Sequence, residues 1–143
     1  MRRRGVLRGA VALALLPWAA SAADAALQAA MREAVGDAVP VEGGIELRLP
    51  AVAENGAQVP LAVLVDSAMT AGDHVAAIHV FATRNPTPGV ASFQLFPGLA
   101  RAEVHTRIRI AEEQAVVVLA RMADGTVRRA SASVKVTRGG CLA

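Results

Sequence analysis

The stretch RAEVHTRIRI, residues 101–110, decides the fold class. In it uncharged side chains alternate with charged or imidazole ones, and no glycine or proline interrupts the run. Successive side chains of a β-strand point to opposite faces of its sheet. The alternation therefore predicts a strand with one face against a core and the other in solvent. The inward residues are Ala102, Val104, Thr106, Ile108 and Ile110; the outward residues are Arg101, Glu103, His105, Arg107 and Arg109.

Strand patterns repeat on both sides of this stretch, separated by turn residues such as Asn55-Gly56 and Asp124-Gly125. Helical segments between the strands are missing, which disfavours a parallel sheet. A short helix over residues 24–37, capped by Asp24, precedes the strands. The sequence predicts an all-β fold, an immunoglobulin-like antiparallel β-sandwich of about seven strands. The predicted strands are residues 45–49, 59–66, 75–83, 90–96, 101–110, 115–122 and 127–137.

Residues 1–22 have the features of a secretory signal: arginines at the start, an apolar run over 11–16, and Ala20-Ser21-Ala22 as a cleavage site. The apolar run is much shorter than the roughly 20 residues that span a bilayer, so a membrane anchor is not expected. Residues 3–8, RRGVLR, resemble a twin-arginine signal, which exports proteins already folded. An ordinary secretory signal with extra arginines is the alternative. Both predict a periplasmic protein.

The remaining chain divides into a sandwich domain at 23–137 and a C-terminal arm at 138–143. The formal net charge of +3 suggests nucleic-acid binding at first sight, but four of the 15 basic residues lie in the signal. Without residues 1–22, 11 basic and 12 acidic residues remain. This balance excludes a strongly basic nucleic-acid surface.

Cys141 is the only cysteine, it stands third from the end, and it follows Gly139 and Gly140. Three extended residues span about 10 Å, so the two glycines place the thiol on a short flexible arm beyond the last strand. The alternative is a structural cysteine that is buried as a small apolar side chain, but burial is hard to arrange so close to a terminus. No CxxC partner or helix N-terminus activates the thiol. The position suits attachment of a group on which other proteins act, rather than catalysis.

Other candidate residues carry weaker signals. Met69, His74 and His79 follow one another at intervals of five, but positions five apart on a strand face opposite sides, so no metal site is expected. Arginines recur near the C-terminal strands and form either a solvated face or a docking surface if their strands are neighbours. These arginines are Arg101, Arg107, Arg109, Arg128 and Arg129. No catalytic triad, P-loop or dinucleotide fingerprint is present, so we expect neither an enzyme nor a bound cofactor.

Taken together, several segments make the chain resemble the SoxY family, the sulfur-carrier subunits of periplasmic thiosulfate-oxidising systems. The leader agrees with this family, and the combination of segments is more specific than a lone Gly-Gly-Cys. The segments are residues 50–60 (PAVAENGAQVP), 66–70 (DSAMT), 78–82 (IHVFA), 85–88 (NPTP), 90–93 (VASF), 106–109 (TRIR), Asp124-Gly125, and 134–137 (VKVT) leading into 139–141 (GGC).

The resemblance implies an immunoglobulin-like sandwich paired with a SoxZ-like subunit. It implies that Cys141 carries thiosulfate-derived sulfur, joined by a SoxAX-like haem enzyme, hydrolysed by a SoxB-like enzyme and oxidised further by a SoxCD-like dehydrogenase. Gly139 and Gly140 would let a narrow tail enter the active sites of these enzymes. The ending Leu142-Ala143 departs from the family, whose tails continue with glycine. This departure puts the identity of the partner enzymes in doubt more than the attachment itself.

Two other functions remain open from the sequence. In the first, the protein is a periplasmic adaptor whose cysteine only forms an intermolecular disulfide. In the second, it is a rhodanese-like sulfurtransferase, but that chemistry needs a rigid loop of backbone amides around the persulfide, which a terminal Gly-Gly-Cys does not provide.

Overall fold

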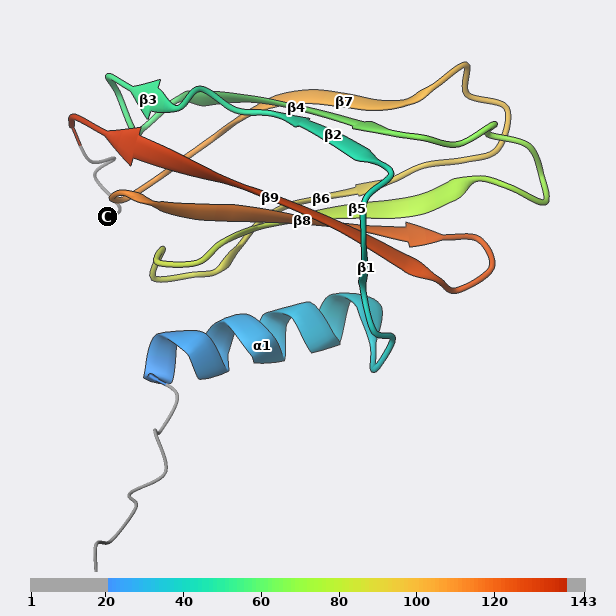
Figure 1. Ribbon diagram of the computed structural model, residues 1–143, viewed down its shortest axis with the longest axis horizontal. Helices are drawn as coiled ribbons and strands as arrows, with labels where there is room; N and C mark the ends of the chain where they lie inside the picture. The colour runs from blue at the N-terminus through green and yellow to red at the C-terminus, as the bar shows by residue number, and fades with distance from the viewer. Residues whose placement is uncertain (1–20, 139–143) are drawn as a thin grey trace, which may run out of the picture.

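The computed structural model describes residues 21–138, which form one helix packed on a two-layered β-sandwich (Figure 1). Nine strands lie in this part of the chain. Seven of them match the seven predicted strands to within two residues at each end, and β1 and β3, of two residues each, are additional. The elements are α1 (Ala22–Val35), β1 (Val41–Glu42), β2 (Ile45–Arg48), β3 (Val52–Ala53), β4 (Val59–Val65), β5 (Val75–Ala82), β6 (Gly89–Gln94), β7 (Ala102–Ile108), β8 (Gln114–Met122) and β9 (Val127–Val136).

The larger sheet has six strands, in the order β1-β9-β8-β5-β6, with β3 also paired to β9. The smaller sheet has the order β2-β4-β7. All pairs of longer strands are antiparallel, which confirms the predicted sandwich. The two short additional strands differ from the long ones, because β1 and β3 both run parallel to β9. Between them the chain crosses to the smaller sheet as β2, so residues 41–53 close one side of the sandwich.

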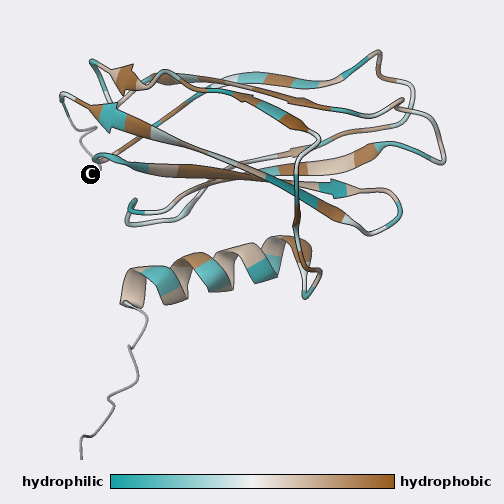
Figure 2. Cartoon of the chain, viewed as in Figure 1, coloured by the Kyte–Doolittle hydropathy of each residue, from teal (hydrophilic) through white to brown (hydrophobic). Residues whose placement is uncertain are grey.

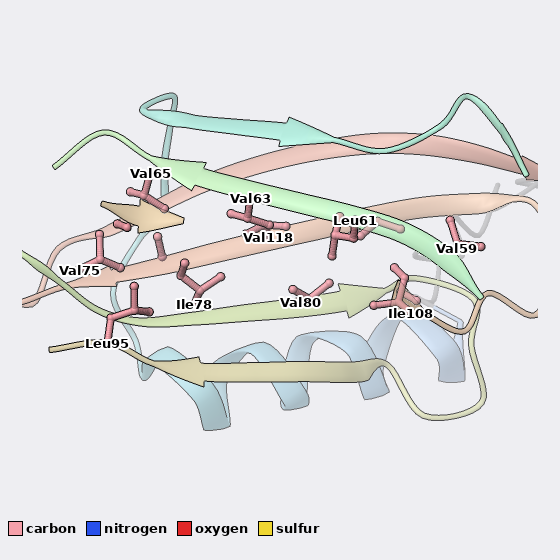
Figure 3. Close-up of a cluster of buried hydrophobic side chains, with 14 of the residues drawn as sticks. Val59, Leu61, Val63, Val65, Val75, Ile78, Val80, Leu95, Ile108 and Val118 are labelled. Atoms are coloured by element: carbon pink, nitrogen blue, oxygen red, sulfur yellow. The ribbon is translucent and has the colours of Figure 1, made fainter. Parts of the chain in front are cut away.

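The core lies between the two sheets and consists of the inward faces of the long strands (Figure 3). In β4 the exposure alternates residue by residue, as expected for a strand with one solvated face. In β8, by contrast, Val116 to Ala120 are all buried. Val116 and Val118 face the sandwich core, while Val117 and Leu119 face the opposite way and pack under the helix.

Helix α1 lies against the larger sheet, and hydrophilic and hydrophobic residues alternate along it (Figure 2). Its apolar residues pack on the outer face of that sheet, and its charged residues are exposed. The sequence placed its cap at Asp24, and this was wrong by three residues. Ser21 is the cap: its backbone is extended and its Oγ accepts from the Asp24 N–H at 3.2 Å. Gly36, with φ 71°, ends the helix and donates to the Arg32 carbonyl. Cleavage after Ala22 would remove the Ser21 cap and leave Asp24 as the next residue able to replace it. Among the described residues no helix is long and apolar enough to cross a membrane.

Leu27 anchors the helix, and its replacement by alanine is expected to loosen the helix from the sheet. Leu27 is the one buried residue of α1 and packs in a cluster with Phe81 and Leu119. Because the cavity would lie at the edge of the fold, Leu27→Ala should reduce the free energy of unfolding by about 2 kcal/mol, near the low end for such changes. Denaturant unfolding followed by circular dichroism measures this loss. Glu33→Ala on the exposed side of the helix is the control, and an equal effect of both changes would contradict the packing described.

Candidate functional site

The predicted site residues Gly139, Gly140 and Cys141 lie outside the described residues, but the point from which they extend is well defined. Backbone and side-chain hydrogen bonds tie the end of β9 to the segment after β3. The Thr137 N–H donates to the Ala53 carbonyl at 3.1 Å, and the Thr137 hydroxyl donates to the Glu54 carbonyl at 3.0 Å. The Gly56 N–H donates to the Arg138 carbonyl at 2.9 Å. The body of the protein therefore holds the chain as far as Arg138, three residues before the thiol.

We call Thr137 and Arg138 the arm base, and Gly56 joins this arm base to both sheets. Its N–H binds the last described residue, while its carbonyl accepts from the Ile110 N–H at 2.7 Å. The preceding Asn55 shapes this loop, because its Oδ1 accepts from the Ala57 N–H at 2.9 Å. The predicted turn at Asn55-Gly56 is therefore confirmed as a loop. It connects β3 of the larger sheet to β4 of the smaller one and holds the arm base.

A buried pair of amide side chains fixes the neighbouring loops. Asn85 donates to the Arg109 carbonyl at 2.7 Å and accepts from the Ala111 N–H at 3.0 Å and from Gln114 Nε2 at 2.8 Å. Gln114 in turn accepts from the Arg84 N–H at 2.7 Å. These two are the buried polar side chains among the described residues, and the bonds given above link the β5–β6 loop to the segment that leads from β7 into β8. Gln114 Nε2 also donates to the Glu112 carbonyl at 3.0 Å, within that segment. Both loops lie at the end of the sandwich where β9 finishes (Figure 1). The sequence reading did not identify this network, because its two members lie 29 residues apart.

The arginines singled out from the sequence do not form one basic face. Arg101 and Arg107 lie at β7 in the smaller sheet, whereas Arg128 and Arg129 lie on β9 in the larger sheet. Arg128 donates to the Asp66 carbonyl at 3.0 Å, and Arg129 forms an ion pair with Glu42. A shared basic face would need these arginines on neighbouring strands, and β7 and β9 are not neighbours. Arg107 alone points toward the arm-base loop, where it donates to Gln58 Oε1 at 3.1 Å.

The three histidines bind different partners. His74 Nδ1 contacts the Thr70 carbonyl at 3.0 Å, and His105 Nε2 contacts Glu103 at 2.9 Å, which lowers the pKa of that carboxyl. Met69 is buried, and its sulfur accepts from the Val75 N–H at 3.5 Å. Within residues 21–138 no group of three or more histidine, cysteine or acidic side chains is placed to hold a metal ion.

A histidine–serine contact is the other feature that the sequence reading missed. His79 Nδ1 lies 2.9 Å from the Ser92 hydroxyl across the β5–β6 pair, while His79 Nε2 is buried without a hydrogen-bond partner. Burial, followed by the positive charge of Arg121, lowers the pKa of His79. The contact is not a hydrolytic pair, because no carboxylate bonds the buried nitrogen to orient the ring for proton transfer. Its role is to join β5 to β6.

His79 is expected to make stability depend on pH. Because its pKa in the folded state lies below the ordinary 6.5, only the unfolded state takes up this proton as pH falls through 6.5. Stability should therefore be full above about pH 6.5 and should decrease as pH falls toward the folded-state pKa. His79→Gln, which does not titrate, should remove this part of the dependence. Melting temperatures between pH 5 and 7.5 test this, and an unchanged His79→Gln profile would contradict the assignment.

The fold and the arm base define a class of protein: a small β-sandwich in which hydrogen bonds from the β3–β4 loop hold the chain at Thr137 and Arg138, and in which a single cysteine follows three residues later in the sequence. Within this class the sequence matches the family described as sulfur oxidation protein SoxY over residues 31–141. The match includes nearly all of the sandwich and ends at Cys141. The chain belongs to the SoxY family.

Solved structures support the same assignment. The sulfur carrier protein SoxY from Chlorobium limicola f thiosulfatophilum is 33% identical with a TM-score of 0.67, over 80% of this chain and 98% of that one. A superoxide reductase (neelaredoxin) from Ignicoccus hospitalis is 13% identical with a TM-score of 0.58, over 66% of this chain and 80% of that one. At that identity the second likeness shows a shared fold only. No curated protein sequence matches the chain.

Proposed function

We propose that this protein is a periplasmic sulfur carrier that holds thiosulfate-derived sulfur covalently on Cys141 and presents it to the enzymes of a sulfur-oxidising system. The observation that carries the proposal is the extent of the family match, which includes Gly139, Gly140 and Cys141 at its end. The Chlorobium protein of similar sequence is a sulfur carrier, and nearly its whole length aligns with this chain. The protein acts as a substrate-presenting subunit rather than as an enzyme.

The chemistry needs only the thiol from this chain. Loading joins the Cys141 thiolate to the outer sulfur of thiosulfate and forms a sulfur–sulfur bond. This oxidation releases two electrons, which a haem enzyme of the SoxAX kind accepts. Hydrolysis by a SoxB-like enzyme then releases sulfate, two protons leave, and a persulfide remains on Cys141. A SoxCD-like dehydrogenase oxidises the remaining sulfur. Because catalysis is supplied by these partners, the carrier needs reach rather than an activated site.

The anchored base supports this division of labour. Hydrogen bonds from Thr137 and Gly56 keep the body rigid up to Arg138. The next three residues span about 10 Å when extended, so a narrow segment can enter an active-site channel while the sandwich stays outside. Leu142 is bulkier than the glycine usual in the family, and we propose that it selects among partner enzymes without preventing attachment. Export by the twin-arginine route, together with a SoxZ-like subunit that forms a heterodimer with this chain, completes the proposal.

Intact-protein mass spectrometry on material from the native periplasm tests the function. Reductant-labile additions of the mass of sulfur or thiosulfate, mapped to the C-terminal peptide, are the expected result. A control digest of the residues before Arg138 should show no such addition. A bare thiol, or a cross-linked dimer without cargo, would instead support the adaptor function and overturn the carrier proposal.

A further inference from the structure

One side of the sandwich ends in an unprotected strand edge. The larger sheet finishes with β6 and the smaller sheet with β7, and these two strands border the same side, because Val90 and Ile108 line one cavity between them. On the opposite side β1 and β3 cover parts of the edge of β9. The edges of β6 and β7 pair with no other strand of the described chain.

The backbone groups on the free edge of β6 can be assigned from the pairing. In the antiparallel pair with β5, Leu95 donates to the Ala76 carbonyl at 3.0 Å, and Phe93 and Ala91 are opposite Ile78 and Val80. Backbone direction alternates along a strand, so the N–H and C=O groups of the residues between these point away from β5. Those residues are Ser92 and Gln94, and no other strand of the described chain pairs with this edge of β6.

The two free edges differ in their protection against strand pairing. Proteins usually guard an edge strand with charged side chains, proline or a cover. The β7 edge follows this rule, since its outward residues are Glu103, His105 and Arg107. Residues 89–94 of β6, GVASFQ, contain neither a charge nor a proline. An uncovered edge strand of six residues without charge or proline can pair with an additional strand.

Apolar and basic surface extends on both sides of this edge. Beyond β6, Phe96 and Leu99 are 66% and 46% exposed in the loop that leads to β7. At the other end, Val90 and Ile108 line a cavity of about 460 Å³, together with the side chains of Arg107 and Arg109. Between residues 101 and 109 the β7 side carries three arginines and one glutamate. A strand that pairs with β6 would therefore bury apolar surface beside a cationic rim.

We infer that the free edge of β6, with Phe96 and Leu99, binds an edge strand of the SoxZ-like subunit, so that the larger sheet continues into the partner. The inference rests on the proposed function for the existence of that partner. The occupant is an extended strand, because a row of alternating donors and acceptors is complementary only to another strand. The cationic rim at Arg107 predicts acidic side chains beside the partner's strand. The heterodimer then leaves the arm base at Arg138 on a different edge, next to β3.

Binding to the purified SoxZ-like subunit, measured by calorimetry with the full mature chain, tests this surface. Gln94→Pro removes an outward N–H and leaves the bonds to β5 in place. Phe96→Ser removes the exposed apolar contact. Each change should weaken the affinity by about 30-fold, as expected for a residue central to an interface. Val39→Ser, at an apolar residue 83% exposed outside the β6–β7 side, is the matched control and should bind like the wild type.

Each outcome bears on a separate statement. If Gln94→Pro lowers the melting temperature, the affinity of Phe96→Ser for the partner alone tests the inference. Wild-type affinity in Phe96→Ser, an equal loss in Val39→Ser, or self-association of the wild-type chain through this edge would overturn the inference. Cargo on Cys141, measured by mass in the same preparations, reports on the proposed function independently. A loaded thiol with undisturbed binding in both variants would leave the carrier function in place and reject only the docking surface.

Discussion

Replacing Cys141 by serine is expected to abolish the reductant-labile mass on the protein and to reduce thiosulfate-dependent sulfate release to background in a reconstituted system. The hydroxyl of serine is not a nucleophile under these conditions and does not form the sulfur–sulfur bond that loading requires. Cys141 is the only cysteine in the chain, so no other thiol can replace it. The fold should be unaffected, because serine has nearly the size and shape of cysteine and the hydrogen bonds described for the sandwich are all made by residues 21–138. Residual loading of Cys141→Ser above background would reject the attachment site.

Deleting Gly139 and Gly140 separates attachment from presentation. The shortened protein keeps the thiol, which should still react with a small aromatic disulfide reagent at nearly the wild-type rate. Loading by the enzyme should fall by about tenfold or more, since the thiol then starts one residue beyond the anchored Arg138 and reaches about 7 Å less far. Replacing Gly139 and Gly140 by two alanines keeps the length of the arm; this variant is the control and should retain most of the loading. Equal enzymatic loading of the shortened and full arms would show that reach is not the property selected in this tail.

Asn85→Ala is expected to cause the largest loss of stability of any polar substitution near the arm base. Asn85 is 8% exposed, and its side chain bonds three groups: the Arg109 carbonyl, the Ala111 N–H and Gln114 Nε2. Alanine leaves the Arg109 carbonyl and the Ala111 N–H without this partner, whereas Gln114 Nε2 keeps its bond to the Glu112 carbonyl. Since an unsatisfied buried group costs about 1–3 kcal/mol, a total loss near 3 kcal/mol is expected.

Denaturant unfolding measures this loss, and Asn55→Ala provides a matched control. Asn55 is exposed and makes one bond, to the Ala57 N–H, so its removal should cost about 1 kcal/mol or less. Hydrogen exchange supplies a second measurement at the site. The Asn85 network holds residues 109–111, and Ile110 binds the Gly56 that holds Arg138, so exchange of the Gly56 amide should become faster in Asn85→Ala. Unchanged exchange would mean that the network does not support the arm base.

Much of the fold followed from local pattern. The strict alternation of residues 101–110 predicted β7 because the two faces of a strand meet different surroundings, and β9 followed from a similar pattern. The strand at 115–122 was also predicted, and the structure explains its apolar run: α1 covers one face of β8 while the other faces the core. The candidate thiol, Cys141, was predicted from its position in the chain and from the family's motif. That prediction depends on sequence alone, because it concerns the chain beyond Arg138.

The amino-acid sequence alone was enough to predict the class of fold, the succession of strands along the chain, the resemblance to the SoxY family and the residue proposed to carry the cargo. Each of these depends on residues close together in the chain or on a shared motif. The tertiary structure decided which distant residues meet. It separated Arg107 from Arg128 into different sheets, joined Asn85 to Gln114, placed Ser92 against His79, and left the neutral edge of β6 uncovered. Such contacts depend on strand order and register, which side-chain alternation along a single strand does not encode, since any strand with the same alternation fits either sheet.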